Sequence, residues 1–140
     1  MRALVQRVAR ASVTVGGQAI SEIGPGLLVL LGVHREDGAE AADWTVRKLL
    51  ALRIFEDEEG RMNRSVREVD VEILCVSQFT LYGDTRKGNR PSFVQAAQPE
   101  VAQPLYEAVC AGLGAERGEF GARMTVELVN DGPVTVLIET

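Results

Sequence analysis

One run of apolar residues constrains the fold of this chain more than any other feature. Leu27 to Val33 reads L-L-V-L-L-G-V and contains no polar side chain. A strand that is apolar on both faces needs packed material on each side, so this run predicts an internal strand. The run is strand-sized and far shorter than the ~20 residues that a membrane-spanning helix needs.

Strand and helix patterns follow one another along the rest of the chain. Val5 to Val15 alternates and is rich in Val and Thr, and Gly16-Gly17 predicts a tight hairpin turn into Q-A-I-S-E-I. Two helices are expected from apolar residues at helical spacing. Their apolar faces are Ala42, Val46, Leu49 and Leu50 in the first helix, and Val101, Leu105, Ala108 and Val109 in the second. Pro104 lies within the second helix, which we expect to kink or to start late.

Further strands are predicted on either side of the second helix. Arg53 to Phe55 is a short one, and Val71 to Val76 reads as a buried one. Met124 to Val129 and Val134 to Ile138 read as two final strands separated by N-D-G-P. The order of strands, helix, strands, helix, strands predicts a single α+β domain over residues 1–140.

Composition excludes several classes of chemistry. His34 is the only histidine, and Cys75 and Cys110, the only two cysteines, read as small buried hydrophobes, so a zinc cluster is not expected. The run Glu56 to Glu59 reads as a solvated turn, and no P-loop or dinucleotide-binding motif occurs. We therefore expect no metal and no cofactor. Without a signal peptide or membrane span, the protein is expected to be cytoplasmic.

Three stretches remain as candidates for function. Ser77, Gln78 and Thr80 follow the buried strand E-I-L-C-V, where they either cap the strand or line a pocket. N-D-G-P-V-T, from Asn130 to Thr135, is either a hairpin turn or a Gly-Pro element whose peptide bond can be cis. D-T-R-K-G-N-R-P-S-F is either a solvated loop or a phosphate-binding loop. Its cations are Arg86, Lys87 and Arg90, within a chain of net charge −5.

These stretches together resemble one family. S-Q-F-T-L and N-D-G-P-V-T are similar to the two signature motifs of the D-aminoacyl-tRNA deacylases. The resemblance extends over nearly the whole chain through M-R-A-L-V-Q-R-V, G-L-L-V-L-L-G-V, R-I-F-E-D, R-K-G-N-R-P-S-F and F-G-A-R-M. It implies a homodimer of subunits with β/β/α layers, a barrel-like sheet and two main helices. It also implies an active site at the subunit interface.

The resemblance further implies a reaction and a set of site residues. The reaction is hydrolysis of the ester that joins a D-amino acid to tRNA, and removal of glycine mischarged onto alanine tRNA. Gly132-Pro133 would enter the partner's pocket and hold the substrate amino group, with Arg7 fixing its orientation. The catalytic pocket would be lined by Ser77, Gln78, Phe79 and Thr80, with Phe120, Gly121, Ala122 and Met124 contributing to substrate binding. Arg86, Lys87 and Arg90 would contact acceptor-stem phosphates.

Two mechanisms and two other functions stay open at this level. The favoured mechanism uses the 2′-OH of the terminal adenosine to activate water, with L-amino acids excluded by Gly132-Pro133. The alternative mechanism uses Thr80 as a covalent nucleophile. A non-catalytic module that binds a tRNA end or a D-amino acid, and a general esterase using Thr80 or Ser77, are the competing functions.

Overall fold

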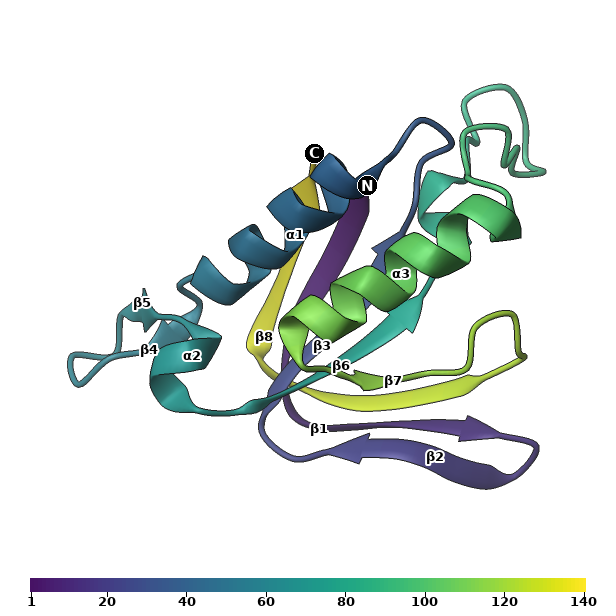
Figure 1. Ribbon diagram of the computed structural model, residues 1–140. Helices are drawn as coiled ribbons and strands as arrows, with labels where there is room; N and C mark the ends of the chain where they lie inside the picture. Colours follow the sequence, from purple (N-terminus) through teal and green to yellow (C-terminus); the bar gives the residue numbers. More distant parts are fainter.

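The computed structural model describes all 140 residues and is built on one strongly curved sheet (Figure 1). Six strands take part, in the order β2-β1-β3-β6-β7, with β8 paired to β1. The strands are β1 (Arg2–Val15), β2 (Gln18–Ile23), β3 (Gly26–Gly32), β6 (Glu72–Ser77), β7 (Glu116–Arg117) and β8 (Thr125–Glu139). No helix combines the length and the apolar character that crossing a membrane requires.

The long strand β1 explains the curvature of the sheet. Its first half pairs with β3, its second half pairs with β2, and β8 runs along it for nearly its whole length. Gly16 and Gly17 form the predicted turn between β1 and β2, with φ values of 57° and 81° that suit a primed hairpin turn. Because β2 also lies against β6 and β7, the sheet is nearly closed into a barrel.

The predicted internal strand is confirmed. β3 lies between β1, which is antiparallel to it, and β6, which is parallel. Successive side chains of β3 point into two separate cores, as the alternation of a strand requires. Leu27, Val29 and Leu31 belong to the core beneath the helices, whereas Leu28 belongs to the core inside the curved sheet. The molecule is therefore layered as β/β/α.

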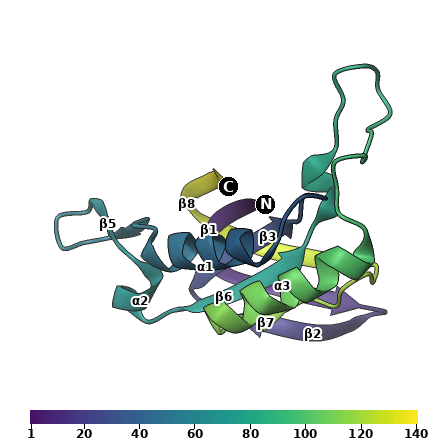
Figure 2. The same cartoon turned by 45° about the horizontal axis from the view of Figure 1, so that its top comes forward.

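Both predicted helices are present and cover one face of the sheet (Figures 1 and 2). They are α1 (Ala39–Ala51) and α3 (Pro99–Leu113), and they pack against each other. A third, one-turn helix, α2 (Val66–Val69), has a capping box formed by Ser65 and Glu68. The small hairpin β4 (Phe55–Glu56) and β5 (Met62–Arg64) precedes it, close to the short strand expected at Arg53–Phe55.

Helix α3 differs from the expectation in two ways. It begins at Pro99, ahead of Pro104, so it does not start late, and a proline suits the first helical position. Its buried face is also shifted by one residue, because Val101 is 42% exposed and Tyr106 is buried instead. The phenol of Tyr106 donates a hydrogen bond of 2.8 Å to the carbonyl oxygen of Cys75, which makes burial of this polar group tolerable.

The prediction of two final strands was wrong. Residues 125–139 form one continuous strand, β8, and N-D-G-P lies inside it rather than in a hairpin turn. β8 pairs with β1 on both sides of this motif, and two register shifts, around Val8 of β1, absorb the irregular residues. Asp-Gly has the local chemistry of a turn, but pairing with β1 keeps the chain running in the same direction.

Candidate active site

A cavity of about 500 Å³ opens at the carboxyl end of β6, where the polar run follows the buried strand. It contains seven of the residues predicted for the site, and none of its lining side chains is ionisable. The lining residues are Val33, Val76, Ser77, Gln78, Phe79, Phe93, Ala96, Ala97, Gln98, Pro99, Ala102, Phe120, Gly121, Ala122, Met124 and Val126. Thr80 stands just outside this set.

The polar run both ends the strand and lines the cavity. The amide of Gln78 donates the last ladder bond, 2.8 Å, to the carbonyl oxygen of Leu31. The chain then turns into the short 3₁₀ helix η1 (Phe79–Tyr82). Within this turn the side-chain amide of Gln78 donates a hydrogen bond to the hydroxyl of Thr80. Thr80 is exposed and thus connects to the cavity through Gln78.

An aromatic pair forms the mouth of the cavity. Phe79 and Phe93 meet edge to face, with 5.1 Å between ring centroids. They remain 54% and 38% exposed, so a large apolar surface surrounds the opening. Phe93 was missed as a site residue from the sequence. The only signal for it was its place at the end of R-K-G-N-R-P-S-F, where it follows the cations that were predicted to bind phosphate.

The wall opposite η1 comes from the segment before β8. Phe120 packs on Tyr106 of α3, with 5.9 Å between ring centroids. Burial and the neighbouring cysteines raise the pKa of Tyr106 well above its usual value, so this phenol stays neutral and holds its bond to β6. Met124 and Val126 also pack into the core inside the curved sheet. The wall is therefore supported by both cores.

Gly132-Pro133 is held rigidly but projects into solvent. The peptide bond between these residues is cis, and both are exposed. Arg7, only 7% exposed, donates one hydrogen bond of 2.9 Å to the carbonyl oxygen of Asp131 and another of 2.8 Å to that of Ile54. The side chain of Asn130 accepts a hydrogen bond of 2.7 Å from the backbone amide of Val134 and donates one of 3.1 Å to the backbone carbonyl oxygen of the same residue. The role of the Asn130 side chain was missed in the sequence.

Gly132-Pro133 does not line the cavity of its own chain. Residue Arg7, which holds the motif, pairs with Leu27, and Leu27 pairs in turn with Ile73 of β6. Ser77 lies four residues further along β6, which is about 13 Å at the rise of a strand. β8 is also separated from β6 by two intervening strands, β1 and β3. A single chain therefore keeps its two predicted site motifs apart.

The basic stretch is a projecting loop, visible at the top right of Figure 2. Asp84 and Ser92 close it by two backbone hydrogen bonds of 2.8 and 2.9 Å. Arg86 donates two side-chain hydrogen bonds to Asp84, and these bonds lower the pKa of that carboxyl to about 2. Lys87 and Arg90 are exposed and make no ion pair. The loop thus offers two free cations rather than three.

The remaining reactive groups lie outside the cavity. Cys75 and Cys110 are unpaired thiols that are fully buried, as expected. The ring of His34 meets that of Tyr82 edge to face, with 5.2 Å between ring centroids, and does not line the cavity. No group of three or more His, Cys, Asp or Glu side chains comes together in a way that could hold a metal ion.

Comparison with known proteins assigns the family. The family model described as D-Tyr-tRNA(Tyr) deacylase matches residues 4–139. A D-aminoacyl-tRNA deacylase from Symbiobacterium thermophilum is 57% identical over 145 aligned positions, which cover 100% of this chain and 96% of the relative. One from Anaeromyxobacter dehalogenans is 59% identical, covering 100% of this chain and 97% of the relative.

Solved structures agree in fold. A protein described as c-Myc DNA unwinding element binding protein superposes with a TM-score of 0.95 at 48% identity, covering 100% of this chain and 99% of the other. A probable eukaryotic D-amino acid tRNA deacylase has a TM-score of 0.81 at 22% identity, with coverages of 98% and 97%, and supports the fold alone. The fold and these matches define a hydrolase. More narrowly, the chain belongs to the D-Tyr-tRNA(Tyr) deacylase family, whose substrate class is aminoacyl-tRNA.

Proposed function

We propose that the cavity at the end of β6 hydrolyses the ester of D-aminoacyl-tRNA, and that two copies of the chain build each site. The observation that carries this proposal is the separation of the motifs within one chain. Gly132-Pro133 is exposed and held in place by Arg7 and Asn130, yet it does not line the cavity of its own chain. In a homodimer the motif of one subunit enters the cavity of the other, and each then completes the other.

Chiral selection follows from what such a motif would exclude. If the backbone carbonyls of Gly132-Pro133 hold the α-amino group and the cavity holds the ester, the substrate side chain can leave Cα in only two directions. A D-side chain points away from the motif, whereas an L-side chain collides with it. Glycine has no side chain and passes, which supports removal of glycine mischarged onto alanine tRNA as a second activity.

The chemistry relies on hydrogen bonds and on the substrate. No ionisable side chain lines the cavity, so the 2′-OH of the terminal adenosine activates or orients the attacking water. The amides of Phe79 and Thr80 stand at the start of η1, where a helix leaves its first N–H groups without internal partners. With the side chain of Gln78, they stabilise the oxyanion. Lys87 and Arg90 contact tRNA phosphates, joined by Arg86 if it leaves Asp84.

Matched deacylation of D-Tyr-tRNA and L-Tyr-tRNA by the purified protein tests the proposal. Rapid loss of the D form with the L form intact is the expected result. Loss of both forms would indicate a general esterase and contradict selection by exclusion. Loss of neither, with retained binding of the charged tRNA, would indicate a non-catalytic binding module.

A further inference from the structure

The short helix η1 lies against the end of β3, where the chain has a glycine. Gly32 is buried, and a Cβ atom added there would lie 3.1 Å from the carbonyl oxygen of Gln78 and 3.2 Å from the Cβ atom of Leu81. Both distances are tighter than ordinary van der Waals contact. The close approach of η1 to the sheet therefore depends on the missing side chain at this position.

One arginine side chain holds η1 on this surface. Arg2 is the partner of Gly32 in the ladder between β1 and β3. Its Nη1 atom donates a hydrogen bond of 2.8 Å to the carbonyl oxygen of Leu81, and its guanidinium carbon lies 4.6 Å from the centroid of the Tyr82 ring. The same cation thus contacts both the backbone of η1 and a buried aromatic ring. Arg2 does not line the candidate active-site cavity itself.

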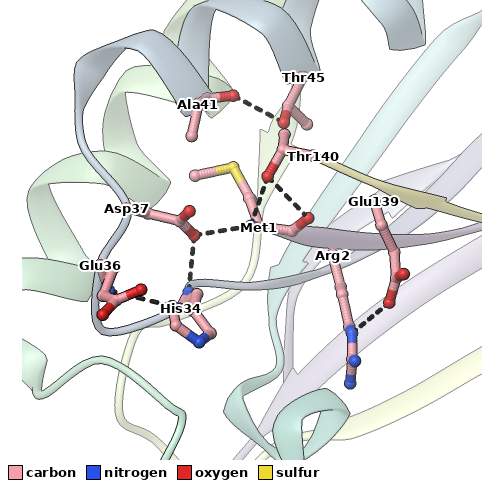
Figure 3. A network of polar contacts seen from close by, with 9 residues as sticks. All are labelled: Met1, Arg2, His34, Glu36, Asp37, Ala41, Thr45, Glu139 and Thr140. Carbon is pink, nitrogen blue, oxygen red and sulfur yellow. Dashed lines mark hydrogen bonds and ion pairs between the residues drawn. The ribbon is translucent and has the colours of Figure 1, made fainter.

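The guanidinium group is oriented by a carboxylate on a third strand. Arg2 of β1 and Glu139 of β8 lie opposite each other in the sheet, and Figure 3 shows the ion pair between Nε of Arg2 and this carboxylate. The two side chains are 33% and 48% exposed, so the pair itself adds little stability. Its effect is on direction, because Nε and Nη1 belong to one rigid plane. A lysine has a single ammonium group and cannot reproduce this geometry.

A displacement of the last residues of η1 would reach the cavity wall. The amide of Leu81 donates a hydrogen bond of 3.2 Å to the carbonyl oxygen of Gln78, whose side chain lines the cavity. Phe79, the first residue of η1, lines the cavity as well. Because η1 has only four residues, a shift at Leu81 and Tyr82 moves its first residue too.

We propose that Arg2 is a positioning residue for the deacylase site. It holds η1 against Gly32, so that Gln78 and Phe79 keep their places at the cavity. The inference rests on the function proposed for that cavity. Arg2 also lines, together with Arg86, a separate cavity of about 390 Å³ at the base of the projecting loop. Direct contact between Arg2 and a tRNA phosphate is therefore the other role that the experiment must distinguish.

The first test keeps the positive charge and removes the planar group. For Arg2→Lys we expect kcat for D-Tyr-tRNA to fall about tenfold with KM nearly unchanged, because small misplacements of catalytic groups are costly. If Arg2 instead contacts phosphate, Arg2→Lys keeps nearly full activity, and Arg2→Ala raises KM and makes the salt slope shallower by about one. Arg47→Lys is the matched control, since Arg47 lies exposed on α1 and makes no ion pair.

The second test displaces η1 from the side of the sheet without changing any charge. Gly32→Ala inserts a methyl group between β3 and η1, and it should also lower kcat about tenfold. Gly38→Ala is its control, because a Cβ atom at Gly38 meets no atom within 4 Å. The double variant Arg2→Lys, Gly32→Ala should lose less than the product of the two single losses, since both changes act on η1.

The aromatic NMR signals of Phe79 report the displacement directly, because Phe79 lies at the opposite end of η1 from Tyr82. They should shift in Arg2→Lys and in Gly32→Ala, and stay unchanged in both controls. Unmoved Phe79 signals in Arg2→Lys would overturn the inference. A rise in KM alone would do the same, and so would a loss that merely follows the unfolded fraction.

The outcome for the wild-type protein separates this inference from the proposed function. A wild-type protein that fails to deacylate D-Tyr-tRNA would overturn the proposed function as well. An active wild type with unaffected Arg2→Lys and Gly32→Ala variants would overturn only the role of Arg2.

Discussion

At the scale of single residues, the site is characterised by neutral polar groups in an apolar frame. The polar side chains that line the cavity are those of Ser77, Gln78 and Gln98, and Thr80 connects to it through a hydrogen bond from Gln78. This arrangement suits stabilisation of developing charge by hydrogen bonds and offers no base to activate a hydroxyl nucleophile.

One substitution tests whether Thr80 acts as the covalent nucleophile. Thr80→Ala should retain most of the kcat for D-Tyr-tRNA, because in the proposed mechanism the nucleophile is water activated by the substrate. Gln78→Ala should lose about 10²-fold, comparable to removal of one oxyanion donor. Single-turnover deacylation measures both. A loss of about 10³-fold or more in Thr80→Ala would favour the covalent alternative.

The two tyrosines give a prediction about alkaline pH. Burial, followed by the nearby Asp37 charge, raises the pKa of Tyr82 from 10.0 to about 12, and burial raises that of Tyr106 further. The unfolded chain loses these protons near pH 10, so folding stability is fully present below pH 10 and falls as the pH rises toward 12 and beyond. Phenolate absorbance at 295 nm should be nearly absent at pH 10.5 in native protein and substantial in guanidinium chloride (about half of full ionisation or more).

Gly132 is the residue whose substitution most directly tests chiral exclusion. Its φ of +148° is rarely adopted by other residues, and an added Cβ would lie 2.7 Å from the amide nitrogen of Val134. Gly132→Ala must therefore displace the motif. We expect D-Tyr-tRNA deacylation to fall about 10²-fold, with melting temperature lowered by only a few degrees. Unchanged D-selectivity at full rate would show that the motif does not contact substrate.

At the scale of secondary-structure elements, the sequence predicted the strands and helices that have a clear apolar pattern. It missed the features that depend on contacts between residues far apart in the chain. Alternation identified β1, continuous apolar runs identified β3 and β6, and helical spacing identified α1 and α3, because burial imposes those patterns. β8 was divided in two, since Asn130 to Pro133 has turn chemistry and its pairing with β1 is invisible locally. For the same reason the sequence did not indicate the Phe79–Phe93 pair or the two hydrogen bonds between the Asn130 side chain and Val134.

The projecting loop predicts unequal roles for its three cations. Arg86 is bound by Asp84, whereas Lys87 and Arg90 are free. Lys87→Ala and Arg90→Ala should each raise KM for charged tRNA by about three- to tenfold, while Arg86→Ala should have a smaller effect. The wild-type slope of log affinity against log salt should be about −2. A markedly steeper slope would implicate further basic residues.

At the scale of the whole molecule, the distance between the motifs is the reason why the proposed homodimer would be part of the catalytic apparatus. A homodimer built as proposed contains two composite sites, each with a cavity from one subunit and Gly132-Pro133 from the other. The exposed apolar mouth around Phe79 and Phe93 is the kind of surface that a partner or substrate covers.

Subunit mixing provides a direct measurement of such composite sites. Gln78→Ala and Gly132→Ala, each nearly inactive alone, should recover activity when unfolded and refolded together. Random pairing makes half of the dimers mixed, with one intact site each, so recovery should approach about a quarter of the wild-type rate. Gln78→Ala mixed with Ser77→Ala alters the cavity of every site and should not recover. Gln78→Ala mixed with a Gln78→Ala, Gly132→Ala double variant should not recover either, because no cavity is intact.

The alternation of β6 has a consequence for how the family can change over evolutionary time. Ile73 and Cys75 face the helices, Leu74 and Val76 face the interior of the curved sheet, and Ser77 and Gln78 follow directly at the cavity. Insertion or deletion of one residue within this strand would turn the side chains beyond it to the opposite core. The same change would move the polar run away from the cavity. We therefore expect length changes among relatives to fall in loops and to leave the spacing from Ile73 to Thr80 unchanged.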